Sequence, residues 1–213
     1  MKEIDESMLS CLRERVLPSM SAKRFRHTVA VEDMVARLAA LYCPEHTNRL
    51  RAAALLHDLT KELRTEEQIA LCKELGLPVT DFDRLSPKTF HARTAASKIP
   101  LEFADFSDPI IVDAVRYHTT GRADMTMTEK LLYLADYIDL SRTFENCVIL
   151  RRFFWGADPH RLDPCGRDAL LRDTLLLSFD MTIRDLLAEG ALIAPDTVDA
   201  RNALRLEKQK TDG

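Results

Sequence analysis

Apolar residues recur at helical spacing along most of the chain. Val31, Val35 and Leu38 follow one another at intervals of three and four residues, which predicts an amphipathic helix over residues 21–43 that ends at Pro44. Such a stripe buries one side of a helix and leaves the opposite side in water. The pattern therefore indicates a helix that covers a hydrophobic core.

Further helices are predicted from capping residues and from the prolines and glycines that interrupt the apolar pattern. Ser86-Pro87 is a typical helix start, and Thr65 opens a capping pattern. Together with the apolar spacing, these signals predict helices over residues 50–59, 65–76, 87–99, 109–118, 126–140 and 166–189. Residues 151–166 match no helical pattern and are expected to be irregular, and a polar tail is expected to close the chain.

The residue usage favours helix over strand. The 213 residues include only six glycines and few runs of β-branched residues, so the expected fold class is all-α. We find no internal repeat, low-complexity stretch or linker that would divide the chain. The sequence therefore predicts a single domain over residues 1–213, with C-terminal helices in residues 166–210 packed on the part that precedes them.

Charge and cysteine usage restrict the classes of partner and compartment. A net charge of −4 does not suit nucleic acid, which requires a basic surface, and no apolar run approaches the roughly 20 residues that span a bilayer. The five cysteines form no CxxC pair, which favours a reduced, intracellular protein. The first residues are too acidic for a signal peptide. We expect a cytoplasmic protein with no nucleic-acid or membrane partner.

Polar residues interrupt the apolar stripes at several helix ends. His27 extends the stripe of the first predicted helix, and His57-Asp58 ends an apolar run. His118 and Asp136 lie on the inward faces of two later helices. Each alone has a plain structural explanation, because a buried histidine is usually a hydrogen-bonded core residue and an aspartate is often a cap. Together they favour one shared metal site, because imidazole and carboxylate bind zinc, manganese and iron.

Such a site would favour hydrolytic chemistry. Two metal ions a few ångströms apart can hold a phosphate, lower the pKa of a water molecule and stabilise a departing oxygen. The chain contains no GxxxxGK[ST], GxGxxG or GxSxG motif that would indicate another type of enzyme.

The order of these residues resembles a known family. Arg24-Phe25-Arg26-His27 and the segment AALLHDLTK at residues 53–61 resemble the opening of HD-superfamily phosphohydrolases. The later segments are similar to the YqeK family of bacterial symmetrical diadenosine-tetraphosphate hydrolases; they are HARTAA at 91–96, YHTTG at 117–121, LADYI at 134–138 followed by Arg142, and residues 194–202.

This resemblance implies an HD-type helical bundle with its motifs within residues 24–142. It also implies a dinuclear centre, of iron or else manganese or zinc, and cleavage of diadenosine tetraphosphate to two ADP by a metal-activated water. The implied ligands of one ion are His27, His57, Asp58 and Asp136, and those of the second are His91, His118 and the bridging Asp58. The implied catalytic residues are Asp58 and Lys61, and the implied substrate contacts are Arg24, His27, His91, Thr119, Thr120, Gly121 and Arg142.

Other hypotheses remain open from sequence. A broader HD-type nucleotide phosphohydrolase would use the same centre, and a nucleotide- or metal-binding regulatory module would have lost turnover. A homodimer is compatible with the sequence. The chain also departs from the family pattern, because Asp139-Leu140-Ser141 stands where an acidic residue and a proline usually precede the arginine. The aromatic run Phe153-Phe154-Trp155 is expected to be local core rather than a lid.

Overall fold

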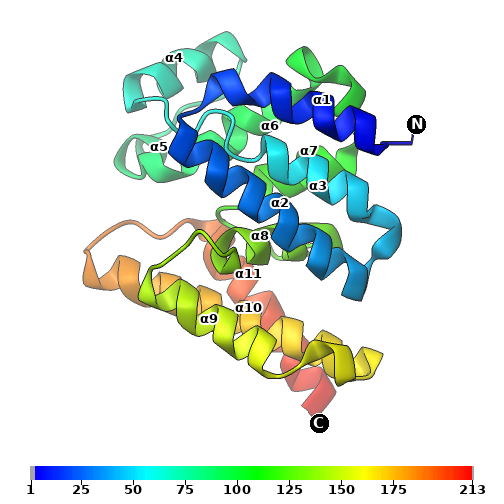
Figure 1. Ribbon diagram of the computed structural model, residues 1–213. Helices are drawn as coiled ribbons and strands as arrows, with labels where there is room; N and C mark the ends of the chain where they lie inside the picture. Colours follow the sequence, from blue (N-terminus) through cyan, green and yellow to red (C-terminus); the bar gives the residue numbers. More distant parts are fainter. Residues whose placement is uncertain (1–2, 213) are drawn as a thin grey trace.

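A computed structural model describes residues 3–212 and shows a helical protein (Figure 1). Eleven α-helices are present in this part of the chain, and none of its residues lies in a strand, so the all-α prediction is confirmed. The helices are α1 Glu6–Val16, α2 Ala22–Tyr42, α3 Thr47–Leu56, α4 Thr65–Glu74, α5 Asp81–Leu85, α6 Phe90–Glu102, α7 Pro109–Tyr117, α8 Met127–Ile138, α9 Glu145–Gly156, α10 Pro164–Ala188 and α11 Pro195–Asp212. Within the same residues, no helix combines the length and apolarity that crossing a bilayer requires.

Helices α2 and α8 lie at the centre of the arrangement. Helix α2 packs against α3 and α8, and α8 also contacts α7 and α9. Figure 1 shows α9, α10 and α11 together beyond α8, on the side away from α1 and α4. The elements that carry the candidate site, α2, α3, α6, α7 and α8, therefore lie between the N-terminal helix and the C-terminal helices.

One continuous hydrophobic core runs from α1 to α11. Its largest fully buried side chains include Tyr133, Phe90, Phe154 and Phe179. The rings of Tyr133 on α8 and Phe179 on α10 are stacked with their centroids 4.6 Å apart, which joins the C-terminal helices to the centre of the fold. Each such ring contributes about 1.5–3 kcal/mol through removal of its apolar surface from water.

The expectation of an irregular segment at residues 151–166 is wrong for residues 151–156 and 164–166, which are helical, and right for residues 157–163, which lie in no α-helix. Helix α9 covers most of its first half, with Cys147, Leu150 and Phe154 buried at helical spacing, and α10 begins at Pro164. The run of three aromatic residues obscured this pattern, because the three side chains point to different surroundings. Phe154 is fully buried, whereas Phe153 is 44% exposed. The prediction of local core is thus confirmed for Phe154, and Trp155 is partly buried against the same core.

Helix α1 was not predicted, and the end of the chain was expected both to contain C-terminal helices within residues 166–210 and to close as a polar tail. Helix α1 precedes the first predicted helix, and the expected polar tail is helix α11, which buries Ala200 and Leu204. These helices are mostly polar, so their apolar stripes are narrow and weak as sequence signals.

The turn after α7 requires glycine. Gly121 has a φ of +66°, and a Cβ atom at this position would lie 2.7 Å from Cζ of Phe179. Any side chain would therefore be strained in the backbone and would collide with α10. The Thr197 hydroxyl also donates to the Thr120 carbonyl at 3.0 Å. Both C-terminal helices, α10 through Phe179 and α11 through Thr197, therefore contact this turn.

Candidate metal centre

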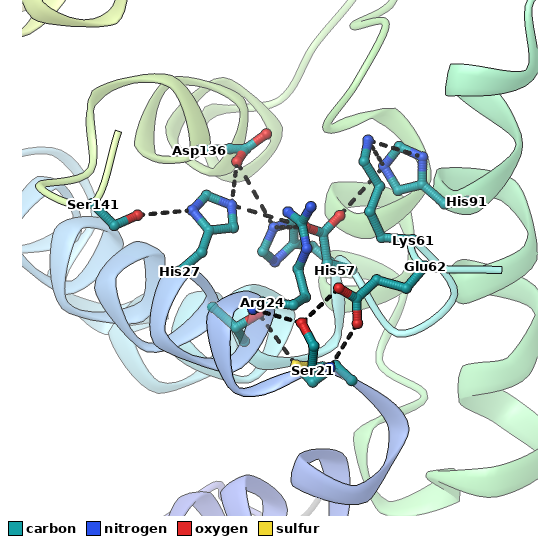
Figure 2. Close-up of polar contacts among 12 residues, drawn as sticks. Ser21, Arg24, His27, His57, Lys61, Glu62, His91, Asp136 and Ser141 are labelled. Carbon is teal, nitrogen blue, oxygen red and sulfur yellow. Dashed lines mark hydrogen bonds and ion pairs between the residues drawn. The ribbon is translucent and has the colours of Figure 1, made fainter. Parts of the chain in front are cut away.

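Six side chains from five parts of the fold meet in one buried cluster, part of which Figure 2 shows. His27 belongs to α2 and Asp136 to α8, whereas His57 and Asp58 follow the last turn of α3. The remaining two are His91 on α6 and His118 at the end of α7. Five of the six are less than 9% exposed, so water cannot satisfy most of their polar atoms.

Asp58 divides this cluster into two halves. Its Oδ2 lies 3.3 Å from Nε2 of His57 and 3.8 Å from Nε2 of His27. Its Oδ1 lies 3.4 Å from Nε2 of His91 and 3.8 Å from Nε2 of His118. We call His27, His57 and Asp136 the His27 half, and His91 and His118 the His118 half. One carboxylate therefore faces both sets of ring nitrogens, which is the arrangement of a bridging ligand.

Two of the histidines are oriented by the helices that they end. His57 and His118 are the C-cap residues of α3 and α7, and each Nδ1 lies 2.6 Å from the carbonyl oxygen of the residue three positions earlier. A carbonyl can only accept, so each Nδ1 carries the proton and donates it. Nε2 of each ring therefore faces the cluster. The partial negative charge of both helix C-termini also favours a cation there.

His27 lies in a more acidic environment. Its Nε2 is 2.9 Å from Oδ1 of Asp136, and its Nδ1 is 3.4 Å from Oδ2 of Asp139 and 3.2 Å from Oγ of Ser141. Burial disfavours the imidazolium, but the hydrogen bonds to Asp136 and Asp139 outweigh it and raise the pKa of His27 to about 9. In the metal-free protein this ring is therefore protonated at neutral pH.

The His118 half shows the opposite behaviour. Burial, reinforced by the nearby His57 ring, lowers the pKa of His118 to about 4. Burial and the charge of Lys61 hold the pKa of His91 well below its ordinary value. The Lys61 ammonium lies 3.2 Å from Nε2 of His91, and burial lowers its own pKa. Both rings are therefore neutral at pH 7.

The two carboxylates are ionised and have arginine partners. Burial opposes the ionisation of Asp58, but the nearby His57 ring outweighs it and the pKa lies well below the ordinary range. Asp136 follows the same pattern, with the Arg142 guanidinium as the largest opposing influence on its pKa. Arg24 donates to Oδ2 of Asp58 at 2.7 Å, and Arg142 donates to Oδ1 of Asp136.

These groups fit a pair of divalent cations. The Nε2 atom of His57 is buried without a hydrogen-bond partner, that of His27 contacts carboxylates alone, and the Nε2 atoms of His91 and His118 face each other at 3.1 Å. Ring nitrogens left unsatisfied or in mutual contact are costly in a protein interior, and a metal ion between them and the carboxylates would satisfy them. Among the described residues, two groups could hold an ion by distance alone, His27 with His57 and Asp136, and His57 with Asp58 and His118.

Not all of the predicted substrate residues face the cluster. The Thr119 hydroxyl lies 3.1 Å from Nε2 of His118, whereas the Thr120 hydroxyl donates to the Gly121 carbonyl and Gly121 packs against α10. A cavity of about 510 Å³ opens beside the His27 half. Its lining consists of Lys23, Arg24, Arg26, His27, Glu62, Ser141, Arg142, Thr143 and Phe144. Lys23, Arg26 and Ser141 were not among the predicted site residues, because a lone exposed cation or serine carries no distinctive sequence signal.

The chain is similar to known proteins in sequence and in fold. The HD domain family matches residues 24–141, which contain all six side chains of the cluster. A symmetrical bis(5'-nucleosyl)-tetraphosphatase of Halalkalibacterium halodurans is 30% identical over 91% of this chain and 95% of that protein. The chain belongs to the YqeK-type family of HD-domain hydrolases. The predicted membership and the HD-type helical fold are thereby confirmed.

Further relatives support the same assignment of this HD-domain hydrolase. A symmetrical bis(5'-nucleosyl)-tetraphosphatase of Bacillus subtilis is 29% identical over 90% of this chain and 92% of that protein. A crystal structure from Clostridium acetobutylicum, described as a predicted HD superfamily hydrolase involved in NAD metabolism, superposes with a TM-score of 0.79 at 29% identity. The match covers 93% of this chain and 97% of that chain.

Proposed function

We propose that this HD-domain hydrolase cleaves diadenosine tetraphosphate symmetrically into two molecules of ADP. The observation that carries the proposal is that the two carboxylate oxygens of Asp58 face two different sets of histidine nitrogens. The relatives of the chain are named symmetrical bis(5'-nucleosyl)-tetraphosphatases, which supports the choice of substrate. The continuous core supports treating residues 1–213 as one domain.

The proposed metal ligands follow the two halves of the cluster. His27, His57, Asp58 and Asp136 would hold one ion, and His91 and His118 would hold the second with Asp58 as the bridge. The distances from both oxygens of Asp58 support this assignment. Iron is our proposal for the native metal, since imidazole and carboxylate ligands suit Fe²⁺ as well as Mn²⁺ and Zn²⁺. When bound, such ions supply Lewis-acid chemistry, which activates a water and offsets phosphate charge.

The cationic residues around the cluster are suited to a polyphosphate. Lys23, Arg24, Arg26 and Arg142 all line the cavity beside the His27 half, although the chain as a whole carries a net charge of −4. Arginine and lysine side chains bind phosphate oxygens through charge-assisted hydrogen bonds. Lys61, on the His91 side, would neutralise further phosphate charge, and the Thr119 hydroxyl would hydrogen-bond an oxygen near the reacting phosphorus.

The proposed reaction balances as a simple hydrolysis. The oxygen of one water molecule forms a bond with one of the two inner phosphorus atoms, and the bond from that phosphorus to the central bridging oxygen breaks. The bridging oxygen leaves with the second ADP, and the protons of the water are released to the products or to solvent. The residues of this chain bind the tetraphosphate and hold it in line for this displacement.

Product analysis in isotopically labelled water tests this proposal. Purified protein loaded with Fe²⁺ or Mn²⁺ is incubated with diadenosine tetraphosphate in ¹⁸O-water, and the nucleotides are separated by anion exchange and weighed by mass spectrometry. We expect ADP alone, with one ¹⁸O atom on a β-phosphate for each pair of ADP molecules, and no product after chelation. AMP with ATP would contradict symmetrical cleavage, and no product from the loaded protein would point to another phosphate ester.

A further inference from the structure

A fully buried carboxylate lies behind His27 and has no role in the proposed reaction. Asp139 is the C-cap residue of α8 and is 0% exposed. Its Oδ1 accepts hydrogen bonds from the backbone N–H of Ser141 at 2.8 Å and from the Ser141 hydroxyl. Its Oδ2 makes no hydrogen bond of the usual geometry, although it lies 3.6 Å from Nε of Arg142 in an ion pair. A buried carboxylate oxygen that accepts no hydrogen bond costs free energy, so its direction calls for an explanation.

The same oxygen also lies close to the ring of His27. Oδ2 of Asp139 lies 3.4 Å from Nδ1 of His27, and Oγ of Ser141 lies 3.2 Å from the same nitrogen. The Ser141 hydroxyl gives its proton to Asp139, so its oxygen can only accept from His27. The Nδ1–H of His27 is therefore shared between two acceptors from one loop, and Figure 2 shows Ser141 beside the ring.

The loop that carries these acceptors is itself fixed. Arg151 on α9 donates to the Ile138 carbonyl at 2.8 Å and to the Arg142 carbonyl at 2.8 Å, and it also donates to the carbonyl of Asp139. Three carbonyls across five residues are thus held by one guanidinium. Arg151 therefore holds the loop, and with it Asp139 and Ser141, next to the His27 ring.

His27 needs an external acceptor for a reason that His57 and His118 do not share. Those two rings cap their helices and donate to a carbonyl of their own last turn at 2.6 Å. His27 lies inside α2, between Ala22 and Tyr42, where the carbonyls of the preceding turn already accept helical hydrogen bonds. Its Nδ1–H can be satisfied only from another part of the chain.

We propose that Asp139, assisted by Ser141, is a positioning residue that orients the His27 ring and keeps its proton on Nδ1, so that Nε2 remains available to a divalent cation. This inference rests on the metal centre of the proposed function. Carboxylates that accept from the second nitrogen of a metal-binding histidine typically change metal affinity by about 10- to 100-fold. The acid alone would leave part of the Nδ1–H unsatisfied, and the Ser141 hydroxyl of this chain completes the contact.

The first test measures the release of metal from loaded protein after a chelator is added. In Asp139→Ala, we expect one of the two ions to leave about 10- to 100-fold faster while the other leaves at the wild-type rate. Ser141→Ala should show a smaller change in the same ion. Leu140→Ala is the matched control, because Leu140 belongs to the same loop and is 69% exposed. If Asp139→Ala released both ions at the wild-type rate, or released both equally faster, Asp139 would not act through His27 alone.

A second measurement needs no metal and separates this inference from the proposed function. In ¹⁵N-histidine-labelled, chelator-treated protein, the Nδ1–H of His27 should give a slowly exchanging proton signal. Exchange should become at least about tenfold faster in Asp139→Ala and return toward the wild-type rate in Asp139→Glu. Unchanged exchange in Asp139→Ala would overturn the positioning role. If exchange responds but wild-type protein binds no metal, the metal centre fails and the orientation of His27 stands.

Discussion

The two halves of the cluster share Asp58, yet the pKa values of His27 and His118 are shifted in opposite directions. In the His27 half, Asp136 and Asp139 raise the pKa of His27 to about 9 against the effect of burial. In the His118 half, burial lowers the pKa of His118 to about 4. The difference follows from burial and neighbouring charge, because two carboxylates, Asp136 and Asp139, face the His27 ring, whereas His118 is fully buried beside the His57 ring.

This difference has a consequence for metal loading. At pH 7 the His118 half offers neutral rings, whereas His27 carries a proton that must leave before its Nε2 can bind an ion. Metal binding therefore competes with a proton in one half only. Variants of the ligands test this contrast, and the largest effect is expected for the variant that should lose the ions of both halves.

Asp58→Asn should have the largest effect, because Asp58 is the only carboxylate that the structure places within 4 Å of ring nitrogens from both halves in the described residues. We expect turnover of diadenosine tetraphosphate to fall on the order of a thousandfold, with loss of both ions in elemental analysis. The circular-dichroism spectrum of Asp58→Asn should remain that of a helical protein. Asp105→Asn, a change at an exposed carboxylate, should retain metal and activity. Full turnover by Asp58→Asn would remove the bridging role.

Single-ligand variants should separate the halves. His118→Ala should retain the ion of the His27 half, and His27→Ala should retain the ion of the His118 half, so each should hold about one ion per chain instead of about two. Elemental analysis after gel filtration measures this ratio. If either variant lost both ions, the halves would not be independent sites.

Proton release should belong to the His27 half. Because the pKa of His27 is raised to about 9, loading the metal-free protein at pH 7.5 should release about one proton from this ring. Calorimetry in buffers with different ionisation enthalpies measures the number released. The release should decrease by about one proton in His27→Gln and remain unchanged in His118→Gln. An equal decrease in both variants would contradict the contrast.

The smallest predicted effect concerns the pH dependence of stability without metal. The folded pKa of His118 is about 4, below its unfolded value, so protons favour the unfolded chain and stability is lost as pH falls from 6.5 toward 4. His27 has a raised pKa, and its contribution is fully present throughout that window. We expect His118 to lower the free energy of unfolding in urea by roughly 1–2 kcal/mol between pH 6.5 and pH 5, and His91, whose pKa is also depressed by burial, to add to the loss in the same direction. His118→Gln should weaken this dependence.

Local patterns in the sequence predict the central helices and five of the six clustered residues, whereas His91 is identified only through the resemblance to the family. A helix such as α2 is set by its own apolar spacing, and a buried polar residue on that stripe is visible without knowledge of its partners. The arrangement around His27 is different, because Ser141 is 114 positions away along the chain and Asp139 is an ordinary helix cap by pattern. Contacts of this kind depend on the packing of α2 against α8, which no local pattern encodes.

Two further helices, α9 and α11, have bounds that the sequence pattern did not define, for the same reason. Helix α11 is mostly polar, and its buried Ala200 and Leu204 acquire their apolar surroundings only from α10. In α9, the spacing of Cys147, Leu150 and Phe154 is helical, but the adjacent exposed Phe153 conceals it. Tertiary packing decided both cases.

The close approach of Gly121 to Phe179 also bears on how the protein is made. All six clustered residues have been synthesised once the chain reaches residue 136, whereas the turn after His118 packs against Phe179 and accepts a hydrogen bond from Thr197. The nascent chain therefore contains every group of the centre about 40 residues before Phe179 is added, and this turn has its full support only when the C-terminal helices are present.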